Sequence, residues 1–83
     1  MGLFGERAPE SEPAVKRMRR ALKKSGAKVT VQEVAYLTWA AQAIDDPSMA
    51  ASYQGMQAQL ELTSAQKGAM DAFLASAGVN NGS

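Results

Sequence analysis

The sequence predicts a small all-α protein, built as a bundle of about four short helices. Two stretches, Thr30 to Glu33 and Thr63 to Gln66, match the capping box, in which two side chains satisfy the first backbone N–H groups of a helix. Apolar residues also recur at spacings of three and four in four segments, with boundaries at Gly26, at Asp45 to Pro47 and at Leu62 to Gln66. The predicted helices cover approximately residues 12–25, 30–45, 47–61 and 64–77.

The first predicted helix has one apolar side and one basic side. It opens at Ser11 to Pro13 and ends near Ser25, where Gly26 suits a C-terminal cap. Six cations fill a contiguous arc of about 160° on its helical wheel. A solvated face usually mixes both charge signs, so we expect contact with a polyanion or an acidic protein surface; an ordinary solvated face is the alternative. The six cations are Lys16, Arg17, Arg19, Arg20, Lys23 and Lys24.

The second predicted helix, from Thr30 to Asp45, is apolar over most of its circumference and therefore belongs in the middle of the bundle. It carries Tyr36 and Trp39 on one of its two apolar faces. We expect these aromatic side chains to pack in the core, near an edge where a polar atom can find a hydrogen-bond partner. The alternative is that Tyr36 and Trp39 form a contact surface for another protein.

The third predicted helix follows a break at Asp45 and Asp46. Asp46 is expected to act as its N-cap, with Pro47 at its first position. We interpret the two adjacent carboxylates as part of this junction, because consecutive side chains diverge and no further acidic group joins them. A narrow apolar stripe runs along this helix, and its two methionines, Met49 and Met56, are expected to fill gaps in a small core, with an adaptable interface as the alternative. The stripe consists of Met49, Tyr53, Met56 and Leu60.

The fourth predicted helix presents one apolar face and stops at Gly78. That face comprises Ala69, Met70, Phe73, Leu74 and Ala77. The 83 residues make one domain, which we place at 11–78. Residues 1–10 are expected to form a flexible arm and residues 79–83 a short tail. Leu3 and Phe4 are expected to anchor the arm to this protein or to a neighbouring one.

The composition argues against several classes of function. The chain has no cysteine and no histidine, so it lacks a thiol or imidazole nucleophile, a Cys/His zinc site and a disulfide. No phosphate-binding loop, dinucleotide fingerprint or calcium-binding loop is present. We therefore predict no enzymatic activity, cofactor, metal or small-molecule substrate. Without an apolar run of membrane-spanning length or a signal peptide, we expect no membrane association, no secretion and a location in the cytoplasm or in a particle assembled inside the cell.

The charge is distributed unevenly along the chain. Residues 1–28 hold eight basic and three acidic residues, and residues 29–83 hold one basic and five acidic residues. Such asymmetry indicates an anionic or acidic partner. The leading hypothesis is a structural subunit that works with protein partners or as a homo-oligomer and presents its first helix within an assembly, such as a nucleoprotein or phage particle. The alternative is a free-standing regulatory or nucleic-acid-binding protein that makes phosphate contacts with little sequence preference.

Overall fold

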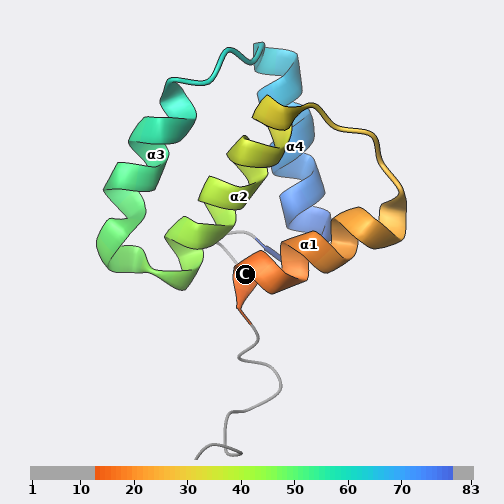
Figure 1. The fold of residues 1–83 in the computed structure, drawn as a ribbon, viewed down its shortest axis with the longest axis horizontal. Helices are drawn as coiled ribbons and strands as arrows, with labels where there is room; N and C mark the ends of the chain where they lie inside the picture. The colour runs from red at the N-terminus through yellow and green to blue at the C-terminus, as the bar shows by residue number, and fades with distance from the viewer. Residues whose placement is uncertain (1–12, 80–83) are drawn as a thin grey trace, which may run out of the picture.

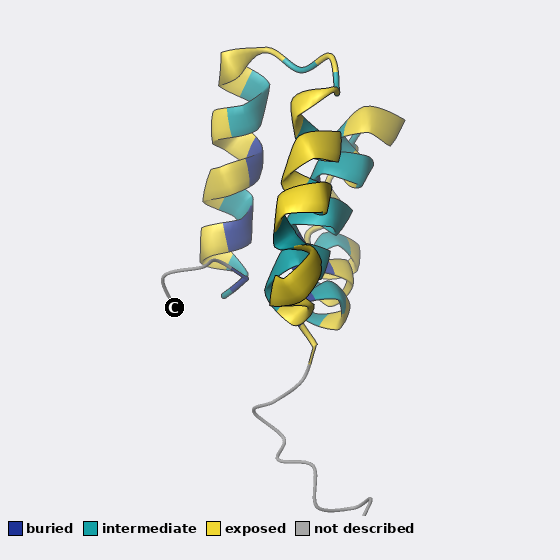
Figure 2. Ribbon diagram, turned by 90° about the vertical axis from the view of Figure 1, so that its left-hand side faces the viewer, coloured by how far each residue is buried: buried dark blue, intermediate teal, exposed yellow. Residues whose placement is uncertain are grey.

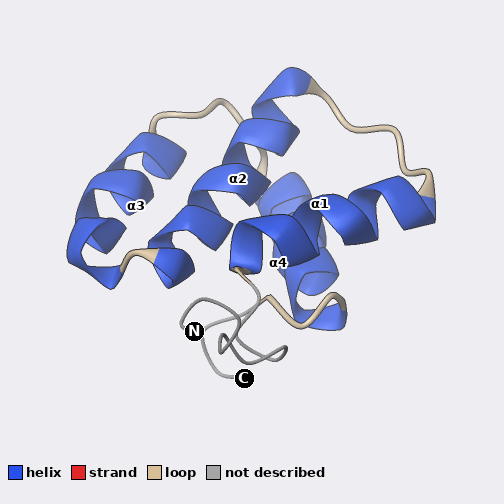
Figure 3. Cartoon of the chain, turned by 60° about the horizontal axis from the view of Figure 1, so that its bottom comes forward, coloured by secondary structure: helices blue, strands red, loops and turns tan. Residues whose placement is uncertain are grey.

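The structure is a computed structural model that describes residues 13–79 and confirms a small all-α bundle (Figures 1 and 3). No strand occurs among these residues. None of the helices in this range is long and apolar enough to cross a membrane. The predicted arm at 1–10, including Leu3 and Phe4, lies outside the described residues. The elements are α1 (Ala14–Ser25), α2 (Val31–Asp45), the short 3-10 helix η3 (Pro47–Met49), α3 (Ala50–Ala58) and α4 (Ser64–Ser76).

Helix α2 is the centre of the bundle, as its apolar circumference predicts. It packs against α1 on one side and α3 on the other, and α4 crosses behind it (Figure 1). The buried side of α4 faces the other helices, and its outer side is exposed (Figure 2). A single cluster of apolar side chains therefore holds α1, α2 and α4 together. Its buried members are Ala14, Met18, Leu37, Ala41, Met70, Leu74 and Val79.

Both predicted capping boxes are present, and they touch each other. The Thr30 hydroxyl accepts from the Glu33 N–H at 3.1 Å, and the Thr30 N–H donates to Glu33 Oε1 at 2.8 Å. Thr63 and Gln66 make the same two bonds at 3.0 and 2.9 Å. Gln66 Nε2 also donates to Glu33 Oε2 at 3.1 Å, which joins the start of α4 to the start of α2. The Thr30 N–H bond, with the Gln66 bond, lowers the pKa of the Glu33 carboxyl.

The C-terminal end of α4 is held by more backbone hydrogen bonds and apolar contacts than the sequence predicts. Gly78 takes the left-handed conformation (φ 76°) and donates its N–H to the Ala75 carbonyl at 3.1 Å. Val79 N–H then donates to the Leu74 carbonyl at 2.7 Å, which completes a Schellman motif. The accompanying apolar contact buries Val79, which is 2% exposed. Val79, assigned to the tail by its sequence position, is therefore a core residue.

The third helix differs most from expectation. Residues 47–49 form a 3-10 turn, and α3 then ends at Ala58, three residues earlier than predicted. Asp46 does not cap it with its side chain; the carboxylate instead accepts from the Ser48 hydroxyl at 2.6 Å. No residue of α3 is buried, and Met49 and Met56 are 43% and 42% exposed. The expectation that Met49 and Met56 fill gaps in the core is wrong, because α3 packs mainly on α2 and its other sides stay open.

Candidate polyanion-binding site

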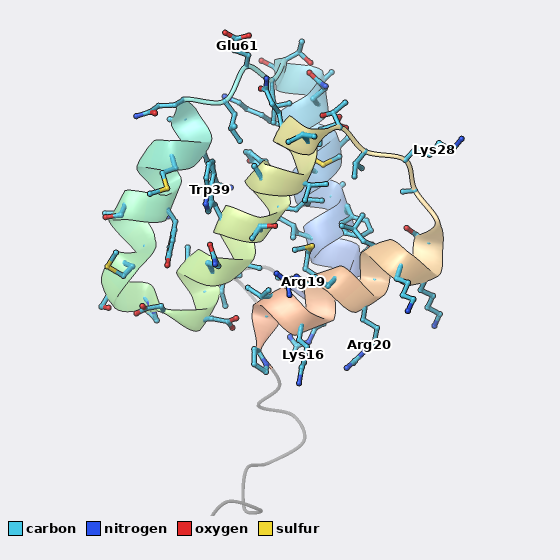
Figure 4. The ribbon with its side chains drawn as sticks, viewed as in Figure 1. Lys16, Arg19, Arg20, Lys28, Trp39 and Glu61 are labelled. Atoms are coloured by element: carbon cyan, nitrogen blue, oxygen red, sulfur yellow. The ribbon has the colours of Figure 1, made fainter. Side chains whose placement is uncertain are left out.

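Five of the six predicted cations form one exposed surface on α1, which we call the basic face. Its exposed residues contrast with the buried Ala14 and Met18 on the other side of the same helix. Lys16 and Arg20 extend away from the remaining helices (Figure 4). Across residues 13–79, no hydrogen bond or ion pair involves the side chains of Lys16, Arg19, Lys23 or Lys24. The basic face consists of Lys16, Arg19, Arg20, Lys23 and Lys24.

Arg17 has a structural task that separates it from the other five cations. It is only partly exposed, and its Nη1 donates to the Gly78 carbonyl oxygen at 2.9 Å. A guanidinium at this position satisfies a carbonyl at the C-terminal end of α4, where the helix dipole favours positive charge. The structure thus places Arg17 at the junction of α1 with α4 rather than within the basic face.

Lys28 adds a cation that the helical pattern alone does not identify. It is exposed in the loop between α1 and α2, and its side chain points outward (Figure 4). Because Lys28 follows the helix terminator Gly26, a helical wheel leaves it out. Its only signal in the sequence is its membership in the basic N-terminal third.

The N-terminus of α1 is capped by a residue from the far end of α2. Pro13 precedes the helix and makes no side-chain cap. Instead, the Asp45 carboxylate accepts from the Ala14 N–H at 2.5 Å and from the Val15 N–H at 3.0 Å. These bonds satisfy two of the N–H groups that lack a partner within the helix, and they place a negative charge at the positive end of its dipole. Asp45 and Arg17 together determine how α1 sits on the bundle.

The two aromatic candidates on α2 lie apart from the basic face. Tyr36 packs against the core, and its hydroxyl donates to Asp71 Oδ1 of α4 at 2.8 Å. Trp39 is partly buried and lies between α2 and α3 (Figure 4). Tyr36 therefore joins α2 to α4, and neither aromatic residue contributes to the surface that α1 presents.

We expect Tyr36 to ionise with a pKa of about 12. Burial of the phenol raises the pKa above 10.0, and the Asp71 carboxylate raises it further. Since the folded protein holds this proton more tightly than the unfolded chain, the resulting stability is complete below pH 10 and is lost as the pH rises toward 12. The tyrosinate absorbance of the unmodified protein minus that of Tyr36→Phe measures this midpoint. Asp71→Asn should lower the midpoint, and an unchanged value would contradict the role given to Asp71.

The described residues offer no other obvious centre of chemistry. Within 13–79, no group of three or more acidic side chains could hold a metal ion. The only adjacent carboxylates, Asp45 and Asp46, are engaged with α1 and with Ser48 respectively. Comparisons of the chain with protein-family models, curated proteins and solved structures give no match. The basic face of α1 is therefore the leading candidate for a functional site.

Proposed function

We propose that this protein is a non-enzymatic component of a nucleoprotein assembly and that the basic face of α1 binds nucleic-acid phosphates. The observation that supports this proposal most strongly is the exposure of five cations on one side of a single helix. Four of them have no partner among the described residues, so their charge is available to an external anion. Clustered Lys and Arg side chains supply the sequence-independent part of nucleic-acid binding.

The chemistry of the basic face favours phosphates over an acidic protein surface. Protein interfaces usually concentrate their binding energy in aromatic or aliphatic side chains at the centre of the contact. The basic face has none, because the larger apolar side chains of α1, Val15, Met18 and Leu22, pack on the core. Long flexible cations without an apolar centre suit a phosphate backbone, which they contact at many equivalent positions.

The proposal predicts sequence-tolerant binding to duplex DNA that weakens steeply with salt. Each phosphate contact changes the slope of log K against log salt by about −0.9, so contacts from Lys16, Arg19, Lys23 and Lys24 give a slope of about −3.6. Lys23→Gln should make this slope less negative by about 1 and should weaken binding to all duplex sequences alike. Fluorescence anisotropy of a labelled 20-base-pair duplex, across a salt series, measures both quantities.

Lys67→Gln is the matched control for this experiment. It makes the same substitution and the same change of net charge, but Lys67 lies on α4, outside the basic face. We expect Lys67→Gln to leave the slope nearly unchanged. Equal effects of the two substitutions would assign the binding to net charge alone, and no binding of the unmodified protein at low salt would remove nucleic acid as the partner.

A further inference from the structure

An apolar groove borders the buried cluster, since Leu74 and Val79 belong to both the cluster and the lining of the groove. Its volume is about 360 Å³, within the range of ligand-binding clefts, and it is bounded by α2, η3, α3 and the end of α4. Figure 1 shows α3 beside α2 and α4 behind it. Its apolar lining includes Ala40, Ala43, Ile44, Pro47, Leu74 and Val79.

Most of the polar groups that line the groove already have partners inside the protein. Gln57 donates its side-chain N–H to the Tyr36 carbonyl at 2.9 Å. The Asp71 carboxylate accepts from the Tyr36 hydroxyl at 2.8 Å. Gln54 is the remaining polar side chain of the lining. An occupant therefore gains little from hydrogen bonding and must bring apolar side chains, whose removal from water is favourable.

Both ends of the described chain adjoin this groove. Val79 is part of the lining, and the chain continues from it into residues 80–83. At the other end, Ala14 N–H is bonded to Asp45, which stands between Ile44 and Pro47 of the lining. Residues that are neighbours in the chain have Cα atoms about 3.8 Å apart, so the segment before Ala14 begins close to the groove.

Composition distinguishes the two segments that start here. Residues 80–83 are Asn, Asn, Gly and Ser, which provide no apolar side chain. Residues 1–12 include Met1, Leu3 and Phe4. The stretch from Phe4 to Pro13 can extend to about 30 Å, which exceeds the length of about 22 Å for a helix such as α2. The N-terminal segment therefore has both the reach and the chemistry to occupy the groove.

We propose that the groove is the docking site for Leu3 and Phe4 of the same chain. Phe4 supplies a large apolar surface to a lining whose alanine side chains leave room for it. The covalent connection raises the effective concentration of the segment at the groove into the millimolar range, so modest contacts suffice. This proposal is independent of the charge on α1, and its failure would leave the nucleic-acid proposal intact.

Paramagnetic broadening tests the docking directly. The chain contains no cysteine, so Glu6→Cys gives a single attachment site for a nitroxide label next to the two anchors. In the full chain, we expect the methyl signals of Ile44, Leu74 and Val79 to lose more than half of the intensity that they have after the nitroxide is reduced. The methyl signals of Leu62, in the loop before α4, serve as the reference for an unaffected site.

The matched control carries the same label together with Leu3→Ser and Phe4→Ser. It keeps the length and charge of the segment, so any broadening that remains is due to the tether alone. Recovery of the groove signals in this control supports docking. Equal broadening in both proteins, or none in either, would overturn the proposal. A further experiment mixes isotope-labelled chains that carry no nitroxide with unlabelled chains that carry it. Broadening of the groove signals in this mixture would assign the groove to a second copy and would also overturn the proposal.

Discussion

Met18→Ala is expected to lower the free energy of unfolding by about 3 kcal/mol. Met18 is 1% exposed and belongs to the buried cluster that joins α1, α2 and α4. Truncation removes buried apolar surface and leaves a cavity in the middle of the core, and large-to-small substitutions of this kind cost about 2–5 kcal/mol. A domain of this size has a total stability of about 5–10 kcal/mol, so the loss is a large fraction. Urea denaturation followed by circular dichroism measures it.

Met56→Ala is a closely matched control for Met18→Ala. It makes the same substitution within a helix, but Met56 is 42% exposed on α3. Its truncation removes less buried surface and creates no enclosed cavity, so we expect a loss below about 1 kcal/mol. The difference between the two losses of stability measures the effect of burial, because helix propensity changes equally in the two proteins. A loss at Met56 as large as that at Met18 would mean that α3 carries a buried face, contrary to the structure.

Asp45→Ala is expected to destabilise the protein by about 1–2 kcal/mol, the usual effect of removing an N-cap. Asp45 provides both of the side-chain bonds at the start of α1, where Pro13 offers none. The same residue ends α2, where its charge opposes the helix dipole. The measured loss of stability therefore underestimates the contribution of the cap. Alanine removes the unfavourable charge from the end of α2 and is also the better helix former.

Asp46→Ala provides the neighbouring control. Asp46 bonds only to the Ser48 hydroxyl through its side chain, and it is exposed. We expect a change within about 0.5 kcal/mol. Amide hydrogen exchange adds a second measurement, because loss of the cap should accelerate exchange in the first turn of α1 and leave α4 unaffected. Similar stability for the Asp45 and Asp46 variants, with unchanged exchange in α1, would contradict the cap between helices.

Features that depend on neighbouring residues could be predicted from the sequence. The boxes at Thr30 and Thr63 require partners three residues away, and both formed as expected. Gly26 ends α1 in the left-handed conformation for a similarly local reason. The basic face follows from helical periodicity, which places its five residues on one side once α1 is formed.

Features that depend on distant residues could not be predicted in the same way. Asp45 caps a helix that begins 31 positions earlier, and no local pattern identifies which helix end its carboxylate reaches. Arg17 looks like its basic neighbours in sequence, but the position of α4 gives it the Gly78 carbonyl as a partner. The Met49 and Met56 stripe has helical periodicity, yet periodicity does not reveal how much of a stripe other elements cover. Contacts between helices decide each of these cases.

The attachment of α1 at two points has a consequence for the thermodynamics of binding. Asp45 holds the start of this helix, and Arg17 ties its first turns to the end of α4. The backbone beneath the basic face is thus preorganised, and a bound anion would order side chains rather than fold a segment. Immobilising a long side chain costs about 0.5–1.5 kcal/mol, whereas coupled folding costs several kcal/mol more. Association with such a helix should accordingly show a small heat-capacity change, the signature of a surface that exists before its partner arrives.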